Sequence, residues 1–338
     1  MNGVGSRRKL RIGLAGAGMI SQYHLTAWRS LDSAEVVALC DPDEMRARER
    51  AGRFAVPRVY ASLEAMLEGE TLDAIDVASP CETHVDLIEA AAARGIDVLC
   101  QKPLAPTLAE AEALARTTAG KIRLMVHENW RFRPWYRQMA RWLSDGRIGD
   151  LLYCNILMFS SGLLDNENGR RPALERQPSL GTEDRLMIAD VLIHHLDVAR
   201  WLLGPLQVAY ARSARTLSYV TGETLATIVL ESPGGMPVVV TGSMAAPGFP
   251  ARTHDRVELI GKAARVILVD TELSLIGREC ERHVYDFDRS YQESFDRTIF
   301  HFADCLARSQ PFETGIEDNL LTLRLVDDAY RAAQRNCP

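Results

Sequence analysis

The sequence predicts an α/β protein of two domains, in which a doubly wound parallel sheet is followed by an α+β domain built on an antiparallel sheet. Up to residue 127, apolar β-rich runs alternate with helical patterns, and such alternation is typical of a parallel sheet. From Asp150 onward, strand-like runs follow one another with few helices between them, which favours antiparallel pairing. The 338 residues are enough for two hydrophobic cores. We therefore place the domains at residues 1–126 and 127–338.

The first element is the stretch Lys9–Ser21, an apolar strand that runs into a glycine turn and then a helix. Gly16 and Gly18 allow the backbone to turn tightly and to approach a bound group. The free N–H groups at the start of the helix, together with its dipole, favour an anion such as the pyrophosphate of a dinucleotide. Ser21 stands where a third glycine is usual. Since an ordinary strand, turn and helix has the same glycine pair, the motif alone leaves both interpretations open.

The second strand, at residues 34–40, ends at Asp41, about 20 residues beyond the glycine turn. A carboxylate there can accept hydrogen bonds from the adenosine ribose hydroxyls of NAD, whereas a ribose 2′-phosphate would meet its negative charge. The alternative is that the sequence Asp41-Pro42-Asp43 caps the next helix. We favour the ribose role and hence NAD, and the nearby Arg46 and Arg48 leave NADP open.

The remaining elements follow the same patterns. In the first domain we expect strands near Val59 and at residues 74–78, 97–100 and 123–127, and helices at 21–29, up to 54, 63–67, 83–94 and 108–119. In the second we expect strands at 151–160, 207–217, 225–231, 238–242, 257–261 and 266–270, one helix at 185–203 and two closing helices at 293–309 and 316–335. Polar segments follow three parallel strands, namely Ser79-Pro80, Gln101-Lys102-Pro103 and His127-Glu128-Asn129. Because ligands of doubly wound sheets bind at the carboxyl ends of the strands, these segments are expected to line the crevice.

Asp190 and His194 lie four residues apart on the helix expected at 185–203, so their side chains share one face, and Asp197 follows on the same side. A carboxylate beside an imidazole fixes its tautomer and suits it to general acid or base catalysis. A single histidine in so apolar a helix is more often a core residue, and we give that interpretation to His195, which points roughly 100° away. Two polar groups are harder to bury, which favours a site at Asp190 and His194.

Lys102 is the other candidate for catalysis, because it ends a buried strand directly before Pro103. Its ammonium group could hydrogen-bond a substrate oxygen and pass a proton if burial lowers its pKa. On position alone, Lys102 would be a surface lysine. Pro103 favours a fixed turn at the crevice, with a cis peptide bond as one option.

Composition excludes several classes of protein. A net charge of -6 without a long basic run argues against a nucleic-acid or anionic-membrane partner. The sequence contains no window of about 20 apolar residues and no signal peptide, so we expect the cytoplasm. Seven cysteines without a CxxC pair argue against a disulfide framework or a structural zinc site and favour free thiols.

Seven motifs carry a family resemblance. They are GAGMIS (residues 16–21), Asp41, ASPCETH (78–84), QKP (101–103), NWRFRP (129–134), GRIGD (146–150) and DVLIHHLD (190–197). In order and spacing they resemble the Gfo/Idh/MocA family. The resemblance implies an N-terminal Rossmann domain, a C-terminal domain with a large open antiparallel sheet, NAD or NADP as cofactor, and sugar or polyol substrates. It also implies that Lys102, Asp190 and His194 line the active site.

The resemblance and the polar strand ends together give the expected site. The expected catalytic residues are Lys102, His194 and Asp190. The expected cofactor-binding residues are Gly16, Gly18, Met19, Ile20, Asp41, Ser79, Pro80, His84, Gln101, Lys102 and Asn129. The expected substrate-binding residues are Glu128, Arg131, Arg185 and His194, with Asn129 and Asn166 as further sources of hydrogen bonds. No metal is required, because a cation and an imidazole can stabilise a developing alkoxide. An open sheet whose outer face needs a cover predicts a homodimer or homotetramer.

Two departures from the family pattern bear on the site. Gln101 replaces the usual Glu, which removes a negative charge that would hold Lys102. Arg185, Leu186 and Leu192 replace common glycines, from which we expect a narrower pocket entrance that presents Arg185 to the substrate.

Residues 101–107 and 125–134 resemble those of D-apiose dehydrogenases, which oxidise the lactol carbon of a branched pentose to a lactone. This favours an NAD-dependent sugar or polyol dehydrogenase. Two alternatives stay open at this point. One is a redox-neutral sugar-modifying enzyme that recycles its NAD, and the other is a non-catalytic regulator that senses NAD or a sugar.

Overall fold

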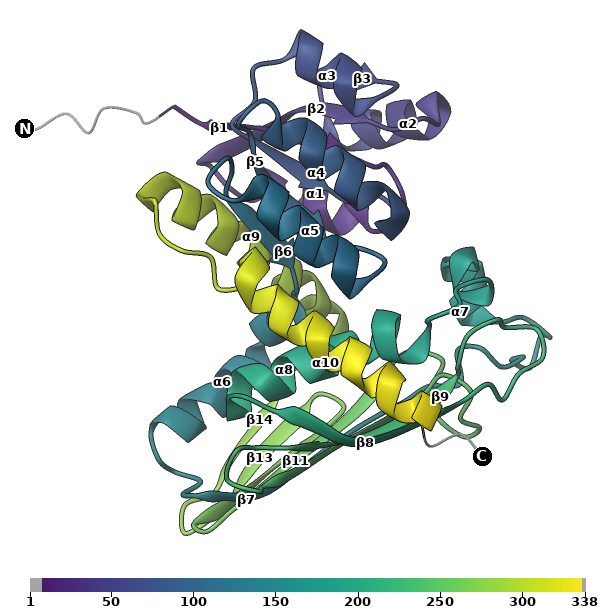
Figure 1. The fold of residues 1–338 in the computed structure, drawn as a ribbon, viewed down its shortest axis with the longest axis vertical. Coiled ribbons are helices and arrows are strands. Elements are labelled where there is room, and N and C mark those ends of the chain that lie inside the picture. The colour runs from purple at the N-terminus through teal and green to yellow at the C-terminus, as the bar shows by residue number, and fades with distance from the viewer. Residues whose placement is uncertain (1–7, 336–338) are drawn as a thin grey trace, which may run out of the picture. The chain divides into compact units, whose positions relative to one another are not determined.

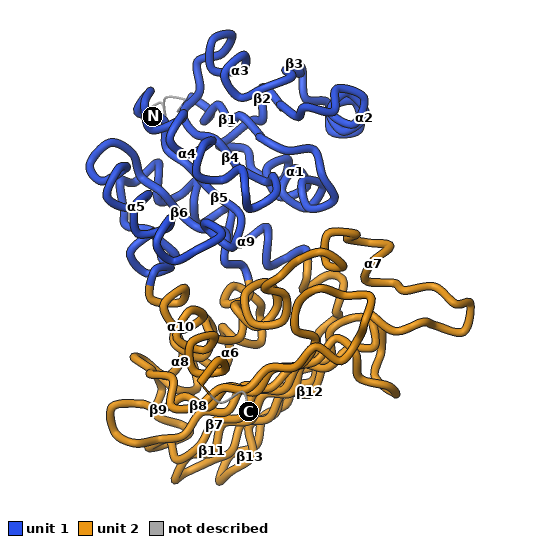
Figure 2. Tube along the Cα trace, turned by 45° about the vertical axis from the view of Figure 1, so that its right-hand side comes forward, with its two compact units in different colours: residues 1–129, 292–320 blue, residues 130–291, 321–338 orange. Residues whose placement is uncertain are grey.

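The chain folds into two compact units in the computed structural model, which describes residues 8–335. Figure 2 shows unit 1 (residues 1–129 and 292–320) and unit 2 (residues 130–291 and 321–338) in different colours. The predicted domain boundary between residues 126 and 127 lies close to the first of these divisions. The return of residues 292–320 to unit 1 was not part of that prediction.

Unit 1 is built on a six-stranded parallel sheet with the order β3-β2-β1-β4-β5-β6 (Figure 1), which confirms the predicted doubly wound sheet. Its strands are β1 (Leu10–Ala15), β2 (Ala34–Cys40), β3 (Arg58–Tyr60), β4 (Ala74–Val77), β5 (Asp97–Gln101) and β6 (Leu124–His127). The helices that alternate with them are α1 (Ser21–Arg29), α2 (Glu44–Phe54), α3 (Leu63–Gly69), α4 (His84–Ala92) and α5 (Leu108–Thr118), with a 3-10 turn η1 (Cys81–Thr83) before α4. The strand order reverses beside β1, and at this switch point the loops after β1 and β4 open a ligand crevice.

The helices of unit 1 begin in two different ways. Asp43, Ser62 and Thr107 cap α2, α3 and α5, each accepting a hydrogen bond from a backbone N–H of the first turn. By contrast, α1 and α4 begin without a side-chain cap, and they follow the two strands that border the switch point. Without a side-chain cap, the positive end of the dipole of each helix can act on a bound anion.

Unit 2 is built on an eight-stranded sheet with the order β14-β13-β12-β11-β7-β10-β9-β8. Its strands are β7 (Leu151–Phe159), β8 (Gln207–Ala214), β9 (Leu225–Glu231), β10 (Pro237–Ser243), β11 (His254–Gly261), β12 (Ala264–Val269), β13 (Glu272–Gly277) and β14 (Glu281–Val284). The prediction of a purely antiparallel sheet is wrong in one place, because β7 and β10 run parallel. A parallel pair needs a long crossover, and the chain between these two strands supplies one.

The helices of unit 2 are η2 (Trp130–Phe132), α6 (Pro134–Ser144), α7 (Pro172–Arg176), η3 (Pro178–Gly181), η4 (Met187–Val191) and α8 (Ile193–Leu203). Two long helices close the chain, α9 (Phe287–Arg308) and α10 (Ile316–Arg335). Side chains on β7 alternate, so that Cys154, Ile156 and Met158 are buried while Asn155 and Leu157 on the other face are partly exposed. Helices α6 and α8 lie on one face of the sheet (Figure 1).

The single helix predicted at residues 185–203 is wrong at its start, where η4 is a π-helical turn. The N–H of Leu192 donates to the carbonyl of Met187, five residues earlier, and α8 follows. The cause lies in the sheet: a Cβ at Gly242 would lie only 2.5 Å from Met187 and 2.8 Å from Leu192, so both side chains press against the bare backbone of β10. Single π turns inside helices are frequently found at functional sites.

The same packing corrects a second prediction. Leu186 and Leu192 are fully buried, so they fill the core of unit 2 and do not narrow a pocket entrance.

Candidate functional site

The glycine turn between β1 and α1 has the shape that a pyrophosphate needs. Gly16 has a φ of +105°, and a Cβ there would lie 2.6 Å from the carbonyl oxygen of Ala78, so only glycine fits at this position. A Cβ on Gly18 would meet nothing within 4 Å, which leaves space for a group to approach the backbone. With the uncapped start of α1 directly after Met19 and Ile20, the turn fits a dinucleotide.

Asp41 lies at the carboxyl end of β2 and holds this turn in place. Its carboxylate accepts hydrogen bonds from Ala17 N at 2.7 Å, Asp43 N at 2.9 Å and the guanidinium of Arg46 at 2.8 Å. Burial alone would raise the pKa of Asp41, but these hydrogen bonds and the charge of Arg46 outweigh it and hold the pKa below its usual range. The helix cap that the sequence offered as the alternative is made by Asp43, whose side chain caps α2.

The loops after β4 and β5 are tied together by His84, which is buried. One ring nitrogen lies 3.0 Å from the carbonyl oxygen of Ser79, and the other lies 2.9 Å from that of Pro103. Burial lowers the pKa of His84. The predicted cofactor residues Ser79, Pro80 and His84 therefore belong to one cluster with the segment that contains Lys102.

Lys102 lies at the end of β5, and the Lys102–Pro103 peptide bond is cis, as the sequence suggested. The side chain of Gln101, which stands where the family usually has a charged Glu, contacts the backbone of Lys102. Its oxygen accepts a hydrogen bond from the backbone N–H of Lys102 at 3.0 Å, and its nitrogen lies 2.8 Å from Nε2 of His24. The difference between Glu and Gln at position 101 therefore concerns the group that accepts the backbone N–H of Lys102.

Two predicted residues follow β6. Asn129 donates a hydrogen bond to the hydroxyl of Ser294 at 2.8 Å within unit 1, and Glu128 is fully buried. Their roles toward cofactor and substrate stay predictions.

In unit 2, the ring of His194 stacks on Trp130. The ring centroids are 4.0 Å apart and the planes differ by 9°, while the guanidinium carbon of Arg133 lies 3.5 Å from the centroid of the same indole. Two groups this close to one ring cannot share a face, so Trp130 is held between Arg133 and His194. Trp130 and Arg133 were not among the predicted site residues, although the aromatic and cationic NWRFRP segment was a signal. The Asp190–His194 pair stays a prediction.

His195 is a core residue, as predicted. It is 1% exposed, and its Nε2 lies 3.1 Å from the carboxylate of Asp255 on β11. Burial would raise the pKa of Asp255, but His195 and the charge of Arg133 together hold it below its usual range.

Arg131 was expected to bind substrate, and that role stays a prediction. It is 1% exposed and donates two hydrogen bonds to Asp197, at 2.7 Å and 2.5 Å. Thr322 also donates to Asp197, at 2.8 Å. The carboxylate of Asp197 is therefore hydrogen-bonded by Arg131 and Thr322, all within unit 2.

Arg185 lies over the ring of Tyr330 at 4.1 Å and 3.9 Å from Asp327. Glu223 holds the π turn nearby, because its carboxylate accepts from Ile188 N at 3.0 Å and from the hydroxyl of Tyr330 at 2.5 Å. Burial and the charge of Glu223 raise the pKa of Tyr330. The segment that contains Asp190 is thus fixed at its start by Glu223.

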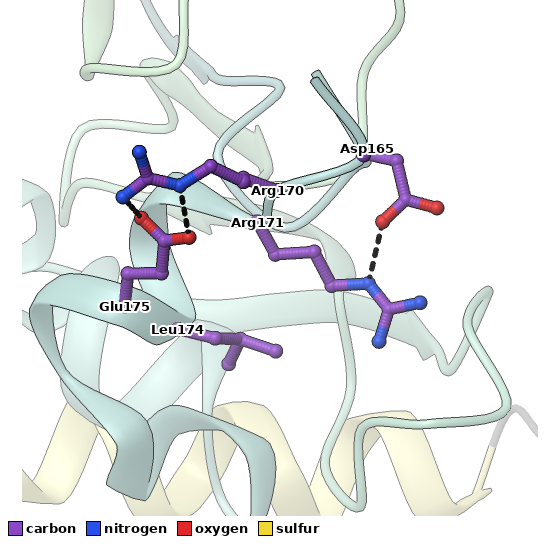
Figure 3. A pocket seen from close by; sticks show the side chains of 6 residues that line it. Asp165, Arg170, Arg171, Leu174 and Glu175 are labelled. Atoms are coloured by element: carbon purple, nitrogen blue, oxygen red, sulfur yellow. Dashed lines mark hydrogen bonds and ion pairs between the residues drawn. The ribbon is translucent and has the colours of Figure 1, made fainter. Parts of the chain in front are cut away.

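A pocket of about 510 Å³ lies elsewhere in unit 2, and Figure 3 shows the side chains that line it. It is lined by Asp165, Gly169, Arg170, Arg171, Leu174 and Glu175. Arg170 pairs with Glu175 and Arg171 with Asp165, so both guanidinium groups have acidic partners. Asn166, a predicted substrate residue, accepts the backbone N–H groups of Asn168 and Arg170 here, which shapes the loop.

Three further findings bear on function. Within residues 8–335, no three or more His, Cys, Asp or Glu side chains form a group that could hold a metal ion. Across the same residues, every helix is too short or too polar to span a membrane. The cysteines that the structure describes are free thiols, and Cys337 lies outside the described residues.

Comparison with known proteins agrees with this geometry. Residues 10–128 match the oxidoreductase family with an NAD-binding Rossmann fold, and residues 136–267 match the GFO/IDH/MocA C-terminal domain. The chain is thus an NAD-binding oxidoreductase.

Individual relatives narrow the class. The D-apiose dehydrogenase of Paraburkholderia graminis is 34% identical over an alignment that covers 97% of this chain and 88% of that protein. The inositol 2-dehydrogenase of Rhizobium meliloti is 26% identical over 96% of both chains. The solved structure of an oxidoreductase from Agrobacterium radiobacter, in complex with NAD+, L-tartaric acid and magnesium, is 28% identical with a TM-score of 0.90 over 97% of both chains. The protein belongs to the Gfo/Idh/MocA family.

Proposed function

We propose that the protein is an NAD-dependent dehydrogenase that transfers a hydride between nicotinamide and a carbinol carbon of a sugar or polyol. The first substrate to test is D-apiose, whose lactol carbon would be oxidised to a lactone. The main support is the identity of 34% and 30% to two D-apiose dehydrogenases over 97% and 96% of this chain. The chain also has Lys102, Asp190 and His194, the three residues to which the proposed mechanism assigns the chemistry.

In the proposed mechanism, NAD accepts the hydride when it is bound. The ammonium group of Lys102 donates a hydrogen bond to the reacting oxygen of the substrate and stabilises the negative charge that develops there. His194 accepts the hydroxyl proton as the C–H bond breaks, and Asp190 orients the imidazole. The stack on Trp130 keeps the His194 ring in one plane, so that its nitrogens are presented in a fixed direction.

We also propose that two copies associate through the sheet of unit 2. The face that alternates away from the buried residues has partly exposed apolar side chains at Leu157 and Val239, and Val269 and Ile276 are 37% and 47% exposed. A sheet face of this kind is usually covered in the native assembly. Sedimentation at micromolar concentration would show a dimer or tetramer, and a monomer would contradict this proposal. The cytoplasmic location stays a prediction.

The experiment is a panel of aldoses and polyols, including D-apiose and myo-inositol, with NAD, followed by the absorbance of NADH. Net NADH formation with D-apiose supports the proposal. A changed sugar without net NADH would support the redox-neutral alternative, and NAD binding without any turnover would support a regulator.

A further inference from the structure

A buried polar cluster lies beneath the crevice of unit 1, and no step of the proposed mechanism uses it. The Asp76 network consists of Asp76 on β4, His24 on α1, Gln101 on β5 and His127 on β6. Asp76, His24 and His127 are fully buried, and Gln101 is 8% exposed. Polar groups so deep in an α/β sheet are costly unless each donor meets an acceptor.

The carboxylate of Asp76 is the fixed point of the network. Nδ1 of His24 lies 2.8 Å and 3.0 Å from its two oxygens, and Nε1 of Trp28 donates to it at 2.6 Å. An ionised carboxylate can only accept. The proton of His24 therefore lies on Nδ1, where it donates to Asp76.

The amide of Gln101 is oriented from two sides. The backbone N–H of Lys102 can only donate, so the amide atom 3.0 Å away from it is the oxygen. The amide nitrogen then faces Nε2 of His24 at 2.8 Å and Nδ1 of His127 at 3.4 Å. Its two hydrogens match two imidazole lone pairs, which requires His24 to be neutral. A proton on Nε2 would place a donor against a donor.

We propose that Asp76 and His24 are positioning residues for Lys102 and act through Gln101. Asp76 sets the tautomer of His24, the tautomer sets the orientation of the Gln101 amide, and the amide oxygen holds the backbone of Lys102. The rings of His127, at 4.4 Å, and Phe295, at 5.5 Å, also pack against His24. This inference rests on the catalytic role proposed for Lys102.

The test combines histidine NMR with steady-state kinetics on the full chain. Nitrogen-15 spectra of NAD-bound protein, with His24 assigned through its substitution, report the tautomer. We expect His24 to be neutral and protonated on Nδ1. In Gln101→Glu a second carboxylate faces Nε2, so His24 should take up a second proton while Lys102 N–H keeps an acceptor.

Turnover with D-apiose and NAD gives the second readout. Gln101→Leu removes the acceptor and should lower kcat about tenfold, whereas Gln101→Glu should stay within about threefold of the unchanged protein. Asp76→Asn leaves the tautomer unfixed and should lower kcat about fivefold. The matched control is Asp97→Asn, since Asp97 accepts from Arg123 N at 2.7 Å at the opposite end of the same sheet. It should change neither readout.

A proton on Nε2 of His24 in the unchanged protein would overturn the inference. Equal kcat values for Gln101→Leu and Gln101→Glu would do the same, even if Asp76→Asn fails to fold. Lys102→Met separates the two proposals. Full turnover in that variant would show that Lys102 is not catalytic. The tautomer of His24 would then be the remaining test of the hydrogen-bond network.

Discussion

The carboxyl edge of the sheet in unit 1 and the His194 segment of unit 2 are built in different ways. In unit 1 the glycine turn is formed by the backbone, since Gly16 shapes it and no side chain caps the start of α1. In unit 2 the His194 segment is held by side chains from distant parts of the sequence, with His194 stacked on Trp130 and the π turn held by Glu223. A backbone site depends on a few residues of special conformation, whereas a side-chain site depends on packing around it. The two should therefore fail differently when residues are changed.

The largest effect on stability is expected at Gly16. Gly16→Ala forces a Cβ against the carbonyl of Ala78 at a φ of +105°, which should lower the free energy of unfolding by about 3 kcal/mol. Gly18→Ala is the matched control, because its Cβ enters open space. It should leave stability within about 0.5 kcal/mol and weaken NAD binding. Urea unfolding measures the stability of the two variants, and titration with NAD measures their affinity for it. Equal stability of the two variants would contradict the backbone account.

A smaller effect is expected at Trp130 in unit 2. Trp130→Leu removes the ring between Arg133 and His194 and should cost about 2 kcal/mol of stability and lower kcat with little change in KM for NAD. Trp130→Phe keeps an aromatic face and should recover most of the turnover. If leucine and phenylalanine gave the same kcat, the stack would have no part in positioning His194.

Glu223 should have a smaller effect again. Glu223→Gln keeps the size but removes one acceptor at the π turn and the charge that faces Tyr330, so we expect a loss of about 1 kcal/mol and a measurable drop in kcat. Thermal unfolding and the kinetics of the D-apiose reaction provide the measurement. A stability loss with unchanged kcat would show that the π turn does not influence Asp190 or His194.

The smallest effect concerns an ion pair outside both sites. Hydrogen bonds from Arg147, and then His283, lower the pKa of Glu281 from 4.5 to about 2. A lowered pKa means that this stabilisation is present above pH 4.5 and is lost as the pH falls toward 2. Because the side chain is 34% exposed, the pair should contribute less than about 1 kcal/mol. Glu281→Gln should flatten the acid limb of stability and leave kcat unchanged. An altered kcat would show that this ion pair at the edge of the sheet influences catalysis.

The sequence predicted unit 1 almost element by element, because buried strands there are short apolar runs bounded by turn residues. Strand β2 and helix α1 have the predicted bounds, and Asp41 lies at the end of its strand as the sequence placed it. Local pattern is sufficient where each element is defined by neighbours in the chain.

The parts that could not be predicted depend on distant contacts. The parallel pairing of β7 with β10, the π turn above Gly242 and the stack of His194 on Trp130 each join segments that no local pattern relates. The orientation of the Gln101 side chain also depends on distant contacts. The sequence shows that Gln stands at this position, but only the buried partners His24 and His127 show that its oxygen faces the backbone N–H of Lys102.

The most direct test of the central claim measures NADH formation from D-apiose in Lys102→Met, His194→Ala and the double variant. If both residues act on the same proton and hydride transfer, each single change should lower kcat by about 10²- to 10⁴-fold, and the double variant should be little slower than the slower single variant. NAD should still bind to all three. Full turnover in either single variant that binds NAD would contradict the account.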